Sequence, residues 1–198
     1  MPLEKAYEDP VVGAVLLRKG RVRGISIRVH PRRGIVVTVP WLVPYAAGIR
    51  FLENRREWVL GSLERQKARL EKASDSGHIL RVKDPVEAAR LRAAARSILP
   101  ARVAFYASRY GFTFGRIFLK ANRSNWGSCS ARGNLNLNIG LAALPEPLRD
   151  YVILHELCHL RHRNHGPEFH TLLDRLCLDA LSTPARSLEK QLKGWILC

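Results

Sequence analysis

The sequence lacks the features of a membrane-spanning or secreted protein. No apolar run reaches the ~18–20 residues that would cross a bilayer, and the first ten residues contain acids but no apolar segment typical of a secretory signal. The four cysteines, Cys129, Cys158, Cys177 and Cys198, lie far apart without a CxxC pair, so a disulfide framework is not expected. These absences favour a reduced, cytoplasmic protein without a membrane partner.

Acidic residues are also few. The chain has 17 Asp and Glu against 33 Lys and Arg, which gives a formal net charge of +16. Two stretches contain no acid, one between Asp9 and Glu53 with eight basic residues and one between Glu87 and Glu146 with nine. Such a surface attracts polyanions, namely nucleic acid, nucleotides or acidic membranes. Because no nucleic-acid-binding motif accompanies the charge, an Arg-rich composition with ordinary solvated faces is an equal alternative.

The 198 residues, 46% of them apolar, are enough for one domain with a core. The pattern predicts a single α+β domain over residues 1–198, with its motif-bearing core at about residues 114–175. An antiparallel β-meander is expected over residues 11–40, with turns at Lys19-Gly20 and at residues 30–34. A helix over residues 44–73 and a short strand near residues 78–82 follow.

The second half returns to helix and strand. The expected elements are a helix over residues 85–111 interrupted at Pro100, a β-hairpin within residues 114–139, a helix from about residue 145 to Asn164, and a helix over residues 167–182. Gly111 is expected to cap the first of these helices, and Arg132-Gly133 is the turn signal of the hairpin.

The helix that begins near residue 145 carries the chemistry. Five of the seven histidines fall within residues 155–170, and residues 155–159 form an HExxH motif. Residues four apart lie on one face of a helix, so His155 and His159 can bind one Zn²⁺ ion at ~2.0–2.1 Å. Glu156 can then take a proton from the metal-bound water. The alternative is a helix whose histidines are merely hydrogen-bonded, which would leave polar groups in an apolar run.

A third metal ligand must come from downstream. His162 would lie ~10 Å along the axis from His155 if the helix continued, which is too far to share an ion. His165 is the preferred ligand because the chain can fold back after Asn164, and the spacing HExxHxxxxxH matches that of metzincins without their glycine. Glu168 is the reserve ligand, followed by His170.

Two cysteines lie near the predicted site. By helical phase, Cys158 points away from the metal and is expected to be a small core residue. Cys129 lies in a Gly/Ser-rich loop and could approach the site, but nothing in its neighbourhood indicates a catalytic thiol.

Four motifs in order resemble the YgjP-like metallopeptidase family across about residues 114–175. They are NWGSCS at residues 125–130, GNLNLN at residues 133–138, YVILHELCHL at residues 151–160, and Asn164-His165 with Phe169. A weaker similarity covers residues 20–60, where a strand ends in Val39-Pro40 and a helix carries Trp58.

The resemblance implies a zincin-like fold related to SprT-like metalloproteases. It implies Zn²⁺ on His155, His159 and His165, with Glu156 as general base. Family members are called metal-dependent hydrolases and are mostly metallopeptidases by motif, and at least one is associated with pyrophosphate release from nucleoside triphosphates such as UTP. This chain has only residues 77–85 where members have a longer β-rich stretch with a Leu-Gly-Arg-x-Tyr motif, and it has His170 where they tend to have Trp. Both departures bear on substrate selection.

The first functional prediction is a zinc-dependent metallopeptidase. The strand at residues 134–139 would be a sheet edge to which an extended polypeptide adds, with Asn136 and Asn138 lining the cleft. Trp126 would form a pocket wall or stack on a base. The alternatives are an ordinary amphipathic strand and structural packing of the loop that carries Trp126.

Two other functions stay open. One is a nucleoside triphosphate (UTP-type) pyrophosphohydrolase, in which the basic stretches hold the triphosphate. The other is a nucleic-acid-binding protein with a structural zinc site, which would need a fourth protein ligand such as Cys129 or His170.

Overall fold

The computed structural model describes residues 3–30 and 34–198, so the predicted turn at residues 31–33 lies outside the described residues. The chain divides into two compact units, unit 1 (Met1–Glu71) and unit 2 (Lys72–Cys198), which are described separately below. That all 198 residues form a single domain therefore stays a prediction. In the described part of the chain, no helix is long and apolar enough to cross a bilayer.

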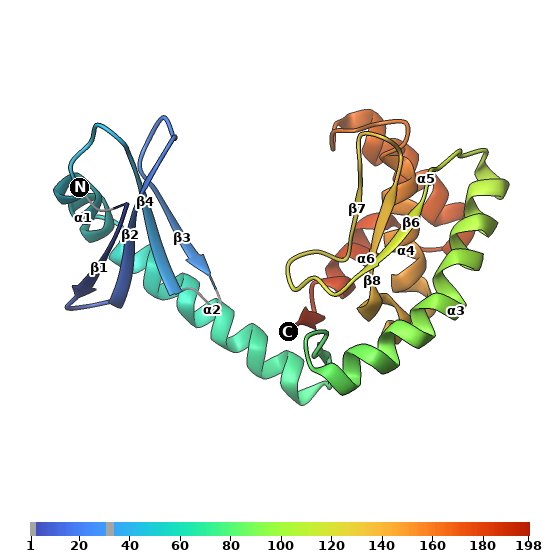
Figure 1. Ribbon diagram of the computed structural model, residues 1–198, viewed down its shortest axis with the longest axis horizontal. Coiled ribbons are helices and arrows are strands. Elements are labelled where there is room, and N and C mark those ends of the chain that lie inside the picture. Colours follow the sequence, from blue (N-terminus) through green and yellow to red (C-terminus); the bar gives the residue numbers. More distant parts are fainter. Residues whose placement is uncertain (1–2, 31–33) are drawn as a thin grey trace. The chain divides into compact units, whose positions relative to one another are not determined.

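Unit 1 contains a four-stranded sheet (Figure 1). Its strands are β1 (Glu4–Asp9), β2 (Gly13–Gly20), β3 (Ser26–His30) and β4 (Gly34–Pro40). They lie in the order β1-β2-β4-β3, with β1 antiparallel to β2, β3 antiparallel to β4, and β2 parallel to β4. The expected antiparallel meander is therefore wrong in its pairing, because β4 separates β2 from β3.

The burial of β4 explains this strand order. All five residues from Ile35 to Val39 are buried, as is typical of a central strand covered on both faces. Lys19 and Gly20 do not form the expected turn, since β2 continues through both and the Lys19 ammonium donates to the carbonyl of Val43. β1 could not be expected from the sequence, because EKAYED holds four charged residues and gives no strand signal.

Two helices, α1 (Tyr45–Glu53) and α2 (Arg56–Asp75), replace the single helix expected over residues 44–73. The break falls after α1, where Asn54 caps the helix and its backbone N–H donates to the carbonyl of Arg50 at 3.2 Å. The buried side chains of Tyr45, Leu52 and Val59 join those of β2 and β4 in the core of unit 1.

A buried ion pair joins α2 to the turn after β1. The Asp9 side chain is fully buried and accepts hydrogen bonds from Arg56 Nη2 at 2.8 Å and from the backbone N–H groups of Val11 and Val12. These hydrogen bonds, led by the one from Arg56, hold the pKa of Asp9 below its usual value against the opposing effect of burial.

Unit 2 combines helices with two small sheets, which confirms the expected α+β class. Its elements are β5 (Ile79–Leu80), α3 (Pro85–Tyr110), β6 (Ile117–Lys120), β7 (Gly127–Cys129), β8 (Leu135–Asn138), the 3-10 helix η1 (Ile139–Ala143), α4 (Glu146–Cys158), α5 (Pro167–Leu181), α6 (Ala185–Leu192) and β9 (Ile196–Leu197). β6, β8 and β7 form one sheet in that order, and β5 pairs parallel with β9.

α3 runs without interruption through Pro100, so the expected break there is wrong. A proline inside a helix costs ~3 kcal/mol relative to alanine, but α3 also buries an apolar stripe with four-residue spacing. The stripe consists of Leu91, Ala95, Leu99 and Val103, each at most 2% exposed. Its burial in the core offsets the cost of the proline. The expected cap at Gly111 is confirmed, since Gly111 has the left-handed φ of 65°.

The β-hairpin of unit 2 joins β7 to β8, through a turn in which Gly133 has a φ of 74°. β6, the first strand expected for the hairpin, instead pairs parallel with β8. β8 is therefore the middle strand, and its expected role as a sheet edge is wrong. Leu135 and Leu137 are fully buried, which explains why this strand takes the centre.

Charged and phenolic groups tie α3 to the first turns of α4. Asp150 is fully buried, and its carboxylate accepts hydrogen bonds from Arg102 Nε at 2.9 Å and from the Tyr106 hydroxyl at 2.9 Å. Arg102 also pairs with the exposed Glu146. The carboxylate thus fixes α4 against α3 from inside the core.

We expect Asp150→Ala to lower the free energy of unfolding by ~3 kcal/mol, because Arg102 would lose the buried partner of its charge. Chemical denaturation followed by circular dichroism measures this. The control is Glu146→Gln, which removes an exposed partner of the same arginine and should change stability by less than ~1 kcal/mol. Equal losses in both variants would contradict the importance of the buried carboxylate.

Candidate metal centre

The HExxH motif lies at the end of α4. This helix is buried on nearly all sides, since seven of the residues from Leu148 to Cys158 are buried hydrophobics. α4 ends at Cys158 and not near Asn164 as expected, but His159 keeps helical dihedrals of φ −65° and ψ −15°. His155 and His159 therefore still lie one helical turn apart, and their ring centroids are 5.0 Å apart.

The chain folds back after α4 and brings a third imidazole to this pair. The rings of His155, His159 and His165 form a group in which one nitrogen of each lies within 4.8 Å of the others. His165 lies 5.1 Å from His155 and 4.7 Å from His159 between centroids. The Nε2 atoms of His155 and His165 are 3.1 Å apart. Two ligands of one tetrahedral zinc ion would be about 3.3 Å apart, so the spacing suits a shared ion.

The early helix end gives His159 a fixed orientation. The backbone N–H groups of Leu160, Arg161 and His162 bond back to Leu157 or Cys158 and form a tight turn. The Nδ1 atom of His159 then lies 3.1 Å from the carbonyl oxygen of His162. If Nδ1 carries the proton that donates to this carbonyl, Nε2 is left as the metal-binding nitrogen, which is a common arrangement around metal-bound histidines.

The remaining candidate ligands lie outside this group. His162 contacts Glu168 instead, with Nδ1 3.3 Å from the carboxylate, and the Glu168 side chain is 83% exposed. The ring of His170 is 6.3 Å from that of His165. Within residues 3–30 and 34–198, neither joins the three histidines as a fourth donor, and Cys129 does not either.

Phe169 forms an apolar floor beneath the three rings. Its side chain is 1% exposed, and its ring centroid lies between 4.6 and 4.9 Å from each of the three imidazoles. Phe169 belongs to one of the sequence motifs, but the motif alone predicts no role for it. Phe169 lies at the start of α5, four residues after His165, and this spacing is the signal that could have indicated a role next to the metal ligands.

Burial lowers the pKa of two of the three histidines. It lowers the pKa of His155 to about 4, with smaller contributions from His159 and His165, and it lowers the pKa of His159 as well. A neutral imidazole presents the lone pair that a metal ion requires.

The Glu156 carboxylate is buried beside this group. Glu156 is 4% exposed, burial raises its pKa to about 8, and its Oε2 atom has no hydrogen-bond partner among the described residues. A buried carboxylate oxygen without a partner is unfavourable unless a ligand completes its environment. The three converging nitrogens fit a bound metal ion, whose positive charge would favour the ionised form of Glu156, the residue after His155.

Gly127 makes room for that carboxylate. A Cβ atom added at Gly127 would lie 2.7 Å from Glu156 Cγ and 2.7 Å from Oε1. The φ of this residue is not in the left-handed region, so the requirement is for space. The sequence could not predict this role, because residues 127 and 156 come together only in the fold.

Two of the three residues predicted to bind substrate have partners within the protein. Asn138 is 2% exposed, its amide donates to the carbonyls of Asn122 and Asn125, and it accepts from the N–H of Gly140. These bonds favour a structural role for Asn138. The amide of Asn136 lies 3.2 Å from Ser128 Oγ on β7, while Trp126 is half-buried against the core. Contact of any of the three with substrate stays a prediction.

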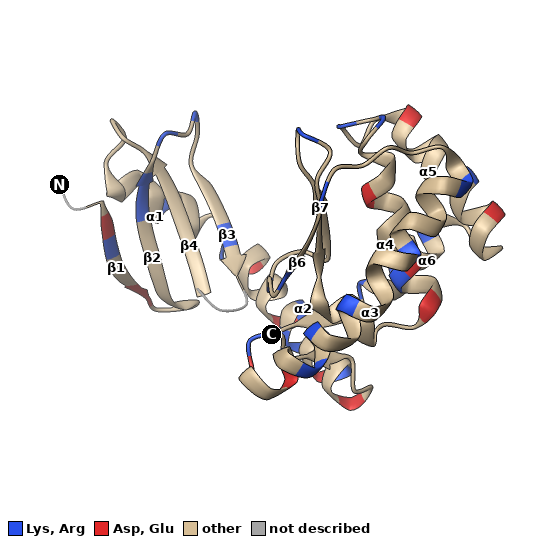
Figure 2. Cartoon of the chain, turned by 45° about the vertical axis from the view of Figure 1, so that its right-hand side comes forward, with Lys and Arg blue, Asp and Glu red and all other residues tan. Residues whose placement is uncertain are grey.

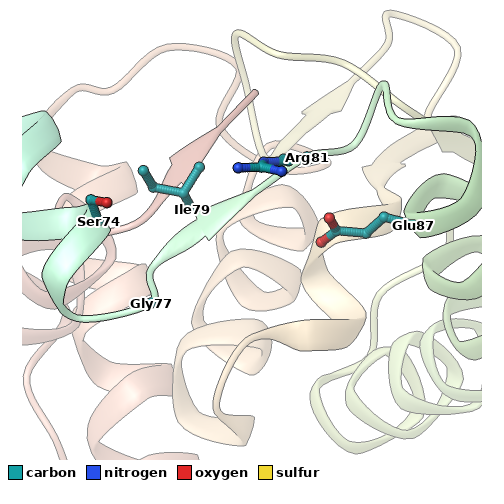
Figure 3. Close-up of a pocket in the computed structure, with 5 residues that line it drawn as sticks. All are labelled: Ser74, Gly77, Ile79, Arg81 and Glu87. Carbon is teal, nitrogen blue, oxygen red and sulfur yellow. The ribbon is translucent and has the colours of Figure 1, made fainter.

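A surface hollow of about 320 Å³ lies elsewhere in unit 2 (Figure 3). Its lining residues are Ser74, Gly77, Ile79, Arg81 and Glu87. It overlaps the short segment that stands where the longer β-rich stretch is expected, and it shares no residue with the histidine group.

The site thus combines an HExxH helix, a third histidine and a buried glutamate, which is the arrangement of a metallohydrolase site. The YgjP-like family, metallopeptidase domain, matches residues 81–191, and the chain belongs to this family. No curated protein matches the chain.

Two solved structures are similar to part of the chain. One is the metallopeptidase zymogen abylysin of Pyrococcus abyssi, with 16% identity, a TM-score of 0.42, and coverage of 48% of this chain and 91% of that one. The other is the zymogen jannalysin of Methanocaldococcus jannaschii, with 23% identity, a TM-score of 0.35, and coverage of 52% and 92%.

We expect the purified chain to bind one divalent transition-metal ion. His165→Ala should weaken that binding by on the order of a hundredfold or more, because changing a residue that only hydrogen-bonds to a metal ligand already costs about 10–100-fold in metal affinity. Elemental analysis after dialysis and calorimetric titration measure this. His170→Ala, a nearby histidine outside the group, is the control and should bind as the natural chain does. Unchanged affinity in His165→Ala would contradict the three-histidine site.

We expect Gly127→Ala to displace the Glu156 carboxylate while leaving the metal ligands in place. Metal stoichiometry should be retained while hydrolytic activity falls by on the order of tenfold or more, because misplacement by about 1 Å can cost ~100-fold. Gly166→Ala is a matched control, since a Cβ atom there meets nothing within 4 Å. Full activity in Gly127→Ala would contradict the steric role.

Proposed function

We propose that the protein is a zinc-dependent metallopeptidase with Glu156 as general base. The observation that carries this proposal is the convergence of three imidazoles, with the buried carboxyl group of Glu156 directly after His155 in the chain and its Oε2 atom without a partner among the described residues. Membership in a metallopeptidase family supports it. The three nitrogen donors suit zinc, which takes imidazole ligands and leaves a coordination position open in catalytic sites.

Each residue of the site has a separate task. His155, His159 and His165 would hold the ion, which when bound supplies polarisation of the attacked carbonyl and a water of lowered pKa. Glu156 would accept a proton from the attacking water at its carboxylate and donate it to the leaving amine. Phe169 would keep water from the rear of the imidazoles, and Gly127 would leave space for the carboxylate to reach the reactants.

Extended polypeptide is the substrate class that the sheet supports. β8 has a partner on each side, so a substrate strand has to add elsewhere. β7 is an edge strand of this sheet, and it carries Gly127, which contacts Glu156. A polypeptide paired with β7 would therefore run past the carboxylate, held by backbone hydrogen bonds.

A nucleoside triphosphate is the second candidate substrate, favoured by the net charge of +16. A purely structural zinc site is less favoured, because the described residues supply three donors and a closed site uses four.

We expect Glu156→Gln to retain zinc and to lose hydrolytic activity by on the order of 100-fold or more, the contribution of a general base. Zinc-loaded protein is assayed against casein, a peptide library and UTP, and bound zinc is measured in parallel. Glu168→Gln is the matched control, because this nearby carboxylate is exposed and outside the histidine group. Cleavage of UTP with no cleavage of polypeptide would replace the peptidase by the second candidate.

A further inference from the structure

One end of the sheet in unit 1 carries a group of exposed side chains that the proposed function does not use. β2 and β4 are parallel and end in register, with Gly20 opposite Pro40. The two loops that leave these strands, residues 21–25 and 41–44, therefore start from the same end of the sheet (Figure 1). Leu3 lies at the same end, because its carbonyl accepts a hydrogen bond from the backbone N–H of Lys19 near the end of β2. The sheet-end tip is defined as Leu3, Arg21, Val22, Arg23, Trp41 and Leu42.

The apolar members of the tip are unusually exposed. Leu42 is 99% exposed, Leu3 57%, Trp41 50% and Val22 40%. Single exposed apolar residues are common on soluble proteins, but several at one site indicate a surface that binds something. A side chain as exposed as Leu42 projects from the surface and lines no groove.

The loop that carries Trp41 and Leu42 is held in a fixed turn. The buried Lys19 ammonium donates to the carbonyls of Pro40 and Val43 and lies 4.7 Å from the centre of the Tyr45 ring. The N–H of Val43 donates to the carbonyl of Pro40 at 3.1 Å. These hydrogen bonds hold the backbone of the turn from its buried side, while the side chains of Trp41 and Leu42 are exposed to solvent.

The tip is also basic. Arg21 and Arg23 are exposed beside Val22 in the loop that joins β2 to β3, where Figure 2 shows blue segments. The sequence has no acid between Asp9 and Glu53. Within the β1–β2 pair, the acid closest to this end is Glu4, which lies opposite Arg18. The occupant of the tip is expected to be anionic.

We propose that the sheet-end tip docks on the surface of an anionic lipid bilayer. Trp41 and Leu42 enter the interfacial layer while Arg21 and Arg23 contact lipid phosphates. A bilayer accepts projecting aliphatic side chains without needing a complementary pocket, as it does those of interfacial anchors. Nucleic acid would bind the arginines through its phosphates and the tryptophan through base stacking, but it would leave the aliphatic side chains of the tip without a partner.

This docking is independent of the proposed peptidase function and differs from membrane spanning. The expectation of no membrane partner rests on the absence of a run long enough to cross a bilayer, whereas a surface contact needs only a few side chains and positive charge.

The full chain is tested by co-sedimentation with vesicles of phosphatidylcholine alone and with vesicles of phosphatidylglycerol and phosphatidylcholine in equal parts. We expect binding to the anionic vesicles and little to the neutral ones. Leu42→Ser should weaken binding by on the order of tenfold through loss of apolar burial. Arg21→Gln and Arg23→Gln should each weaken it by about fivefold.

Matched controls separate the tip from general surface properties. Val86→Ser removes an apolar side chain that is 80% exposed in unit 2, and Lys67→Gln removes an exposed charge from α2. Both should sediment as the natural chain does. The circular dichroism spectrum of each variant shows whether it is folded.

Three outcomes would overturn the proposal. The first is the absence of natural-chain binding to anionic vesicles, and the second is equal binding by Leu42→Ser and Val86→Ser. The third is a loss of a different activity by the tip variants while their vesicle binding stays unchanged. That activity is binding of a single-stranded oligonucleotide, or self-association measured by gel filtration.

Discussion

The apolar packing around α4 is the constraint on which the histidine site depends. Seven buried hydrophobic residues lie on this helix, and the same burial lowers the pKa of His155 and raises that of Glu156. In water, an imidazole with an ordinary pKa would be partly protonated near neutral pH. Burial in this packing disfavours the protonated form of His155, so its ring keeps the lone pair that a cation needs, and it favours the protonated form of Glu156.

The ion pair between Arg102 and Asp150 extends this constraint to α3. Asp150 lies five residues before His155 on the same helix, so the carboxylate fixes one end of α4 and the fold-back to His165 fixes the other. Long-range contacts of this kind set the position of the ligands. They also explain why α3 can include Pro100, since the helix is held by its neighbours and not by its own hydrogen bonds alone.

The sequence predicts the parts of the site that follow from local geometry. His155, Glu156 and His159 follow from helical spacing, and His165 follows from the length of chain needed to fold back. The sequence does not predict the helix end at Cys158. The tight turn that replaces the expected continuation of the helix is formed by backbone hydrogen bonds from residues 160–162 back to Leu157 and Cys158, and the sequence pattern does not show these bonds. Phe169 and Gly127 are missed as site residues, since their roles depend on atoms brought close only by the fold. The same holds for β4, whose place between β2 and β3 follows from burial on both faces.

The space at Gly127 has an evolutionary consequence. Any larger residue at position 127 would collide with the carboxylate of residue 156, so the two positions are coupled even though they lie far apart in the sequence. In a chain that kept the histidines and lost the acid at position 156, position 127 would be free to vary. A homologue with Ala or Ser at position 127 and a shortened or neutral side chain at position 156 would thus mark a lineage that retained the metal scaffold for a non-hydrolytic purpose.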